Sequence, residues 1–147
     1  MVNPIDIAFA ILKMPYHGTS LTNAQKIMEE GLKPVESEYS LYHDIPPVSF
    51  SAEDYEEALE HANWTHGTET PAIIHIPDEV EPFETHGWMH TYDKTIPPDQ
   101  LSIHWQGEPY NPEQHGDESA WRKLNEELAM QKLPANLFHT STSNDNA

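Results

Sequence analysis

Residues 16 to 31 restrict the fold of this chain more than any other part of its sequence. A short strand, Tyr16–Ser20, is predicted to run directly into a helix that opens with the capping-box spacing Thr22-x-x-Gln25 and ends at Gly31. Within the strand, Gly18 permits a tight turn or the close approach of backbone to a ligand. Apolar residues recur at helical spacing inside the helix, namely Ala24, Ile27 and Met28.

Strands and helices follow in mixed order, which predicts an α+β domain. Four further strands are expected at 48–51, 72–76, 88–92 and 101–105, and a short capped helix is expected before Pro15. The spacing Ser51-x-x-Asp54 predicts the start of another helix, which turns Ala58, Leu59 and Ala62 inward. Residues 33–47 lack periodicity but contain aromatic residues, so we expect an ordered loop that could cover a pocket.

The length of 147 residues fits one domain with one core. We expect residues 1–106 to form this domain and residues 107–138 to pack on it as an appended helical segment. The helix of that segment, from about Asp117 to Met130, is expected to bury Ala120, Trp121, Leu124 and Leu128. Residues 139–147 are built of small polar residues and are expected to be disordered.

The charge of the chain restricts its partners. Asp and Glu number 25 against 7 Lys and Arg, a net charge of -18, which disfavours nucleic acid and anionic membranes as partners. Solubility, a salty habitat or mimicry of nucleic acid would each explain such a charge. There is no cysteine, no apolar run long enough for a membrane span and no signal-peptide pattern, so we expect a cytoplasmic protein.

Three successive patterns carry a resemblance to a known family. They are an apolar residue before Tyr16-His17-Gly18-Thr19-Ser20, a helix closed by Glu30-Gly31-Leu32, and the strand Val48-Ser49-Phe50-Ser51 followed by a helix with Ala58 and Ala62. Over residues 14 to 105, this order resembles the ADP-ribosyltransferase superfamily of the His-Tyr-Glu type. The resemblance implies an α+β fold with a split β-sheet core, flanking helices and an appended C-terminal helix. The alternative is a surface turn in an unrelated α+β domain.

The resemblance also implies an NAD pocket and gives its residues roles. His17 would bond the ribose nearest the nicotinamide, the backbone of Gly18 would hold the carboxamide, and Thr19 would lie beside them. Ser49 aligns with a position where the poly(ADP-ribose) polymerases stack a tyrosine on nicotinamide. Because Ser49 cannot stack, the aromatic face would come from Phe50, Tyr42 or Tyr39, although Phe50 alone is also explained by core packing.

The third motif of the family is weakly matched. The family usually offers a Glu that orients the ribose and activates the acceptor, and Glu84 is the nearest carboxylate here. His90 could serve instead as a base, because its ordinary pKa suits proton transfer near neutrality. Chain-extending polymerase activity is therefore not expected.

An RNA-phosphate site and a metal site are the two alternatives to the NAD pocket. The RNA 2'-phosphotransferases match the layout from Val48 to Leu101 about as well, but they need several arginines for an RNA phosphate, and Arg122 is the only arginine here. The pair His86-x-x-x-His90 has the spacing of metal ligands. A third ligand cannot be named from the sequence, so no metal site is predicted.

From this resemblance we expect an NAD-dependent mono-ADP-ribosyltransferase, with His17, Glu84 and His90 as catalytic residues. Its ligand-binding residues would be His17, Gly18, Thr19, Ser49, Phe50 and Tyr42. NAD would be its small-molecule substrate, with a protein as a possible acceptor. Two alternatives remain open: a catalytically silent module that binds NAD or ADP-ribose, and an acidic inhibitor protein of the phage-encoded kind.

Overall fold

The computed structural model describes residues 15–87 and 89–132. The helix expected before Pro15 and the tail expected to be disordered lie outside them. No helix among the described residues has the length and apolar character needed to cross a membrane.

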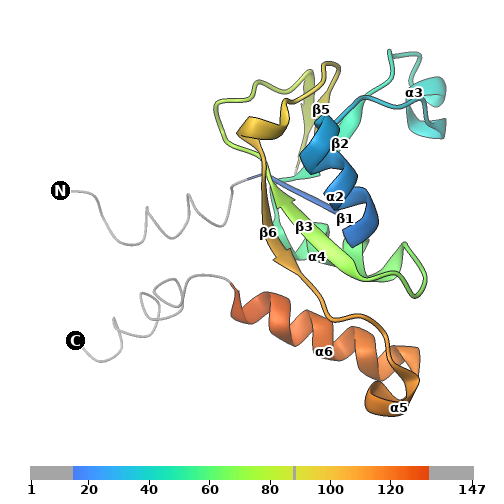
Figure 1. Cartoon of the computed structure of the whole chain (residues 1–147). Coiled ribbons are helices and arrows are strands. Elements are labelled where there is room, and N and C mark those ends of the chain that lie inside the picture. Colours follow the sequence, from blue (N-terminus) through green and yellow to red (C-terminus); the bar gives the residue numbers. More distant parts are fainter. Residues whose placement is uncertain (1–14, 88, 133–147) are drawn as a thin grey trace, which may run out of the picture.

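Six antiparallel strands form one open sheet in the order β4-β5-β2-β1-β3-β6 (Figure 1). The strands are β1 (Tyr16–Ser20), β2 (Ser49–Ala52), β3 (Pro71–His75), β4 (Glu84–His86), β5 (Met89–Tyr92) and β6 (Ser102–Gln106). The mixed α and β architecture expected from the sequence is confirmed at this level. Strand β4, which forms a hairpin with β5, was not predicted.

The two sides of β1 are paired very differently. On one side, β1 and β3 are in register along the whole of β1, from Tyr16↔His75 to Ser20↔Pro71. On the other side, β1 and β2 share the single pair Tyr16↔Ala52. We call the β1–β3 contact the closed seam and the β1–β2 contact the open seam. The sheet is thus divided into two halves that are joined at one point.

Two hydrophobic clusters lie on opposite faces of the sheet, because successive side chains of a strand point to opposite faces. In β3, Ile73 belongs to one cluster, and its neighbours Ala72 and Ile74 belong to the other. Helix α4 (Tyr55–Trp64) and helix α6 (Glu118–Gln131) contribute to the first cluster, whereas α2 (Leu21–Glu30) contributes to the second. The sheet is therefore covered by helices on both faces.

Arg122 fastens α6 to the end of α4. Its guanidinium donates to the carbonyl of Asn63 and, over 2.7 Å, to that of Gly67, and it lies 4.9 Å from the ring of Trp64. The Asn63 amide donates back to the carbonyl of Arg122 over 2.9 Å. A second anchor is the Tyr55 hydroxyl, which donates to the Ala129 carbonyl over 2.9 Å. These buried bonds hold the appended helix against α4.

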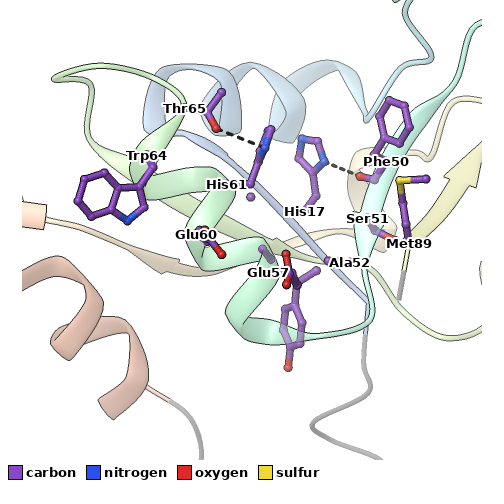
Figure 2. A pocket seen from close by; sticks show the side chains of 13 residues that line it. His17, Phe50, Ser51, Ala52, Glu57, Glu60, His61, Trp64, Thr65 and Met89 are labelled. Atoms are coloured by element: carbon purple, nitrogen blue, oxygen red, sulfur yellow. Dashed lines mark hydrogen bonds between the residues drawn. The ribbon is translucent and has the colours of Figure 1, made fainter. Parts of the chain in front are cut away.

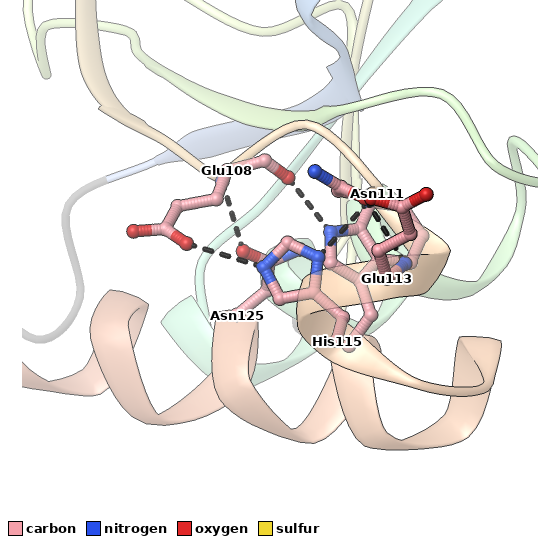
Figure 3. A network of polar contacts seen from close by, with 6 residues as sticks. Glu108, Asn111, Glu113, His115 and Asn125 are labelled. Atoms are coloured by element: carbon pink, nitrogen blue, oxygen red, sulfur yellow. Dashed lines mark hydrogen bonds and ion pairs between the residues drawn. The ribbon is translucent and has the colours of Figure 1, made fainter.

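The connection from β6 to α6 is ordered by polar contacts (Figure 3). It contains the short helix α5 (Pro112–His115). His115 accepts from the backbone N–H of Asn111 over 3.0 Å, which leaves its Nε2 to donate to Glu108 over 3.4 Å. The backbone N–H of Glu108 donates to Asn125 of α6 over 3.0 Å. The predicted polar segment is thus a structured turn.

Two helices are capped by residues other than the predicted ones. Ser20, not Thr22, caps α2, because its side chain accepts from the backbone N–H of Asn23. Asp54, not Ser51, caps α4, since Ser51 is still part of β2. Helix α2 does end at Gly31, with φ of 92°, as predicted.

Two further expectations need correction. The predicted loop 33–47 contains a helix, α3 (Glu38–Tyr42), stabilised by a reciprocal capping box between Ser37 and Ser40. Helix α6 buries the predicted face only in part: Leu124 and Leu128 are half-buried, and Leu128 packs against the first cluster. Trp121 is buried as expected, but Ala120 is exposed, and the rest of the buried face is polar or small: Arg122, Asn125 and Ala129.

Candidate functional site

A cleft of about 520 Å³ lies at the open seam, between β1, β2 and α4 (Figure 2). Its volume falls in the range of small-molecule sites, which is roughly 300 to 1,000 Å³. The cleft is lined by Tyr16, His17 and Gly18 of β1, by Phe50, Ser51 and Ala52 of β2, by Glu57, Ala58, Glu60, His61 and Trp64 of α4, and by Thr65 and Met89.

The backbone of Gly18 is directed toward this cleft. In an antiparallel ladder, alternate residues bond to the partner strand, and the residues between them point the other way. Ile76 donates to the carbonyl of Pro15 over 3.0 Å and Leu21 donates to that of Thr70 over 2.6 Å, so the odd-numbered residues of this segment face β3. The N–H and C=O of Gly18 therefore face the open seam, where β2 has already diverged.

The missing side chain of Gly18 serves a second purpose. A Cβ at this position would lie 1.9 Å from the carbonyl oxygen of Ala58 and 3.1 Å from the backbone nitrogen of Ala62. Helix α4 can pack this closely on β1 only because residue 18 is a glycine. The sequence predicted a tight turn or a close approach of a ligand at Gly18. In the structure, Gly18 lies in the middle of β1, and helix α4 approaches its backbone closely.

His17 bridges the open seam. Its Nδ1 donates to the carbonyl oxygen of Phe50 over 2.6 Å (Figure 2), which connects β1 to β2 beyond their last register pair. Burial is the main cause that lowers the pKa of His17 to about 4; the hydrogen bond to the Phe50 carbonyl opposes this shift, and the nearby His61 and His66 add to it. The imidazole is thus neutral at pH 7. With its proton on Nδ1, it presents Nε2 as a hydrogen-bond acceptor.

Helix α4 forms the opposite wall of the cleft. Its lining residues recur at positions i, i+3, i+4 and i+7: Glu57, Glu60, His61 and Trp64. The Nδ1 atom of His61 lies 3.4 Å from the hydroxyl oxygen of Thr65, which follows the helix. None of these four residues was predicted to belong to the site. A polar stripe at helical spacing, opposite the predicted apolar stripe of the same helix, was the signal that could have revealed them.

The structure brings together His17, Gly18 and Phe50 of the predicted binding residues. Thr19 and Ser49 do not line the cleft, and each is only 4% exposed. Tyr42 lies on α3 with 86% exposure and also does not line the cleft. Tyr39 is the residue of α3 that contacts Phe50, with their ring centroids 5.2 Å apart.

Glu84 and His90 lie outside the cleft lining as well. Both belong to the β4–β5 hairpin, where Glu84 contacts His86 Nε2 over 2.6 Å and His90 Nδ1 lies 2.9 Å from the hydroxyl of Thr85. His90 also faces Glu53 at 3.9 Å. Met89, the neighbour of His90, is the hairpin residue that reaches the cleft. The carboxylates in the cleft come from α4 instead.

Within residues 15–87 and 89–132, no group of three or more His, Asp or Glu side chains is arranged to hold a metal ion. His86 and His90 therefore find no third ligand in that part of the chain. No protein-family model matches the sequence, and comparisons with curated proteins and with solved structures gave no significant match.

Proposed function

We propose that the cleft binds the nicotinamide end of NAD and that the protein is a mono-ADP-ribosyltransferase. One observation carries this proposal: His17 and the outward-facing backbone of Gly18 lie side by side on one wall of a cleft of suitable volume. A carboxamide needs a donor and an acceptor close together. The N–H and C=O of a single strand residue offer that pair without an intervening side chain.

The remaining lining completes such a pocket. The imidazole of His17 accepts a hydrogen bond from a ribose hydroxyl through Nε2, since its Nδ1 is held by Phe50. Phe50 and Trp64 offer aromatic surface to the pyridine ring from β2 and α4. Because His17 is neutral at pH 7, it does not repel the positive charge of the nicotinamide ring.

The reaction in this proposal breaks the bond between the pyridine nitrogen and C1' of the ribose. The bonding electrons move to the nicotinamide, which leaves uncharged, and the positive charge passes to the ribose. The acceptor then bonds to C1' and releases its proton to a base. We assign the base and the stabilisation of the ribose to Glu57, which is half-buried in the cleft lining, in place of Glu84 or His90.

Incubation with NAD labelled in the adenosine half tests the proposal. The wild-type protein in a cell lysate should transfer label to a macromolecule and release nicotinamide. The His17→Ala variant should lose about 100-fold in rate, because it removes the ribose contact and the bridge to Phe50. Tyr42→Ala is the matched control, since its side chain is exposed and outside the cleft. Absence of both transfer and nicotinamide release would rule out the enzyme.

A second candidate function is binding of NAD without chemistry. It is favoured by the position of Glu84 and His90 on the hairpin, outside the lining of the cleft. This function predicts that NAD raises the unfolding temperature of the protein while no nicotinamide is released. Measuring both quantities in the same sample separates the two candidates.

A further inference from the structure

The charged side chains that line the cleft are of one sign. Glu57 and Glu60 line it, and none of the lysines or the arginine in residues 15–87 and 89–132 does so. The lining also contains His17, which is neutral at pH 7 because burial lowers its pKa to about 4. A ligand in this cleft therefore meets negative charge and no positive charge from the lining.

Arg122 is a strong cation next to this wall, because its guanidinium lies over the ring of Trp64. Its side chain is committed to α4: it is buried, donates to the carbonyls of Asn63 and Gly67, and lies 3.6 Å from Glu118. Turning toward a phosphate would leave those two carbonyls without their donor, which is costly in a buried place. Arg122 is thus not available as a phosphate ligand.

The aromatic lining suits the same kind of ligand. Trp64 is 49% exposed and belongs to the helix stripe that carries Glu57 and Glu60, and its ring already holds the guanidinium of Arg122 at 4.9 Å from its centroid. Phe50 lies across the cleft on β2. The faces of aromatic rings attract cations, and the effect adds to that of nearby carboxylates. An aromatic cation satisfies both parts of the lining at once.

We propose that the cleft selects its ligand by positive charge, taking the cationic pyridinium nucleoside end of NAD and leaving the diphosphate outside without an ion pair. This inference rests on the proposed function and specifies which part of the ligand the cleft binds. Two carboxylates near the ring and the ribose favour the oxidised, charged ring over its reduced, uncharged form. They disfavour any ligand that enters phosphate first.

Calorimetric titration with four ligands tests this selectivity. Nicotinamide riboside is a monocation, its dihydro form has nearly the same shape without the charge, and ADP-ribose is a dianion that lacks the ring. NAD carries all the parts together. We expect nicotinamide riboside to bind about tenfold more tightly than its dihydro form or ADP-ribose at low ionic strength. NAD should bind no more tightly than nicotinamide riboside.

Variants of α4 identify the origin of the preference. The double variant Glu57→Gln, Glu60→Gln removes both lining carboxylates at nearly constant volume, and the preference for nicotinamide riboside over its dihydro form should fall to near unity. Glu56→Gln is the matched control: it removes the same charge from the same helix, but its side chain is exposed and does not line the cleft. It should keep the preference.

The outcomes separate this inference from the proposed function. Binding of NAD and ADP-ribose with equal or greater strength than nicotinamide riboside refutes charge selection and leaves NAD binding intact. A preference that survives in the double variant also refutes it. Failure of all four ligands to bind refutes both proposals. Charge-selective binding without release of nicotinamide from NAD upholds the inference and removes the transferase.

Discussion

The closed and open seams of β1 show how one strand supports both the fold and the candidate site. Along the closed seam, each residue from Tyr16 to Ser20 has a register partner in β3, and the backbone groups that face this side serve the sheet. Along the open seam, pairing ends after Tyr16↔Ala52. The backbone groups of Gly18 then face a cleft instead of a strand.

The difference between the two seams shows how a small domain can offer backbone N–H and C=O groups to a ligand. Strand backbone is rigid, and its donors and acceptors are at fixed positions. If a neighbouring strand diverges, those groups become available without extra side chains. His17 accommodates the divergence, because its ring spans the gap to the Phe50 carbonyl over 2.6 Å.

The largest effect is expected from Gly18→Ala. The new methyl group would lie 1.9 Å from the Ala58 carbonyl oxygen, which is backbone and cannot rotate away, so α4 must move off β1. We expect the free energy of unfolding in urea to fall by about 3 kcal/mol or more. Gly67→Ala is the control: a Cβ there meets nothing within 4 Å, and only its φ of 63° is unfavourable. That should cost about 1 kcal/mol. Equal losses in both variants would show that the helix contact is unimportant.

A pair of truncations compares the two seams directly. Ile73→Ala empties a fully buried position on the closed seam and should lower the free energy of unfolding by about 3 kcal/mol. Phe50→Ala acts on the open seam, where the side chain is only half-buried and lines the cleft, and should cost about 1 kcal/mol. Chemical denaturation of both variants measures the difference. Phe50→Ala losing as much as Ile73→Ala would mean that the open seam is closed in solution.

A third effect concerns pH. The folded state holds the pKa of His17 at about 4, below its ordinary value of 6.5, so the unfolded state binds the proton more readily. The neutral imidazole of His17 contributes fully to the free energy of unfolding above pH 6.5, and this contribution is lost as the pH falls toward 4. Between pH 7 and pH 5 the wild type should lose about 2 kcal/mol more than His17→Gln, which has no titrating group at this position.

Unfolding curves at several pH values in this range provide the measurement. Other buried imidazoles, His75 and His104, also have lowered pKa values because of burial, so both proteins will lose stability in acid. Only the difference between wild type and variant reports on the open seam. Parallel pH profiles would contradict a buried, neutral His17.

The local elements with strong signals could be predicted from the sequence. Strand β1, helix α2 and its end at Gly31 follow from turn chemistry and periodicity, and the inward residues Ala58, Leu59 and Ala62 of α4 follow from helical spacing. Of the predicted binding residues, His17, Gly18 and Phe50 lie together in the lining of the cleft, and their role in binding stays a prediction. These are short-range features, or features that lie on adjacent strands.

The remaining site residues depend on tertiary arrangement. Which residue of 38–42 approaches Phe50 is decided by the orientation of α3, which places Tyr39 there and leaves Tyr42 exposed. Glu84 lies in an unpredicted hairpin, and its distance from the cleft follows from the strand order. The polar stripe of α4 faces the cleft only because the sheet opens beneath it. No local pattern in the sequence encodes that opening.

Trp64 belongs at once to the cleft wall and to the attachment of the last helix. Its indole nitrogen donates to Glu126 of α6 over 2.9 Å, and Arg122 of α6 covers its ring. The position of this ring in the cleft wall therefore depends on its contacts with α6. A ligand that bound only with this ring in its present position would stabilise the docked state of α6. A change that released α6 would lower the binding constant of that ligand by the same factor. The appended helix thus holds a wall of the cleft in place, although none of its residues lines the cleft.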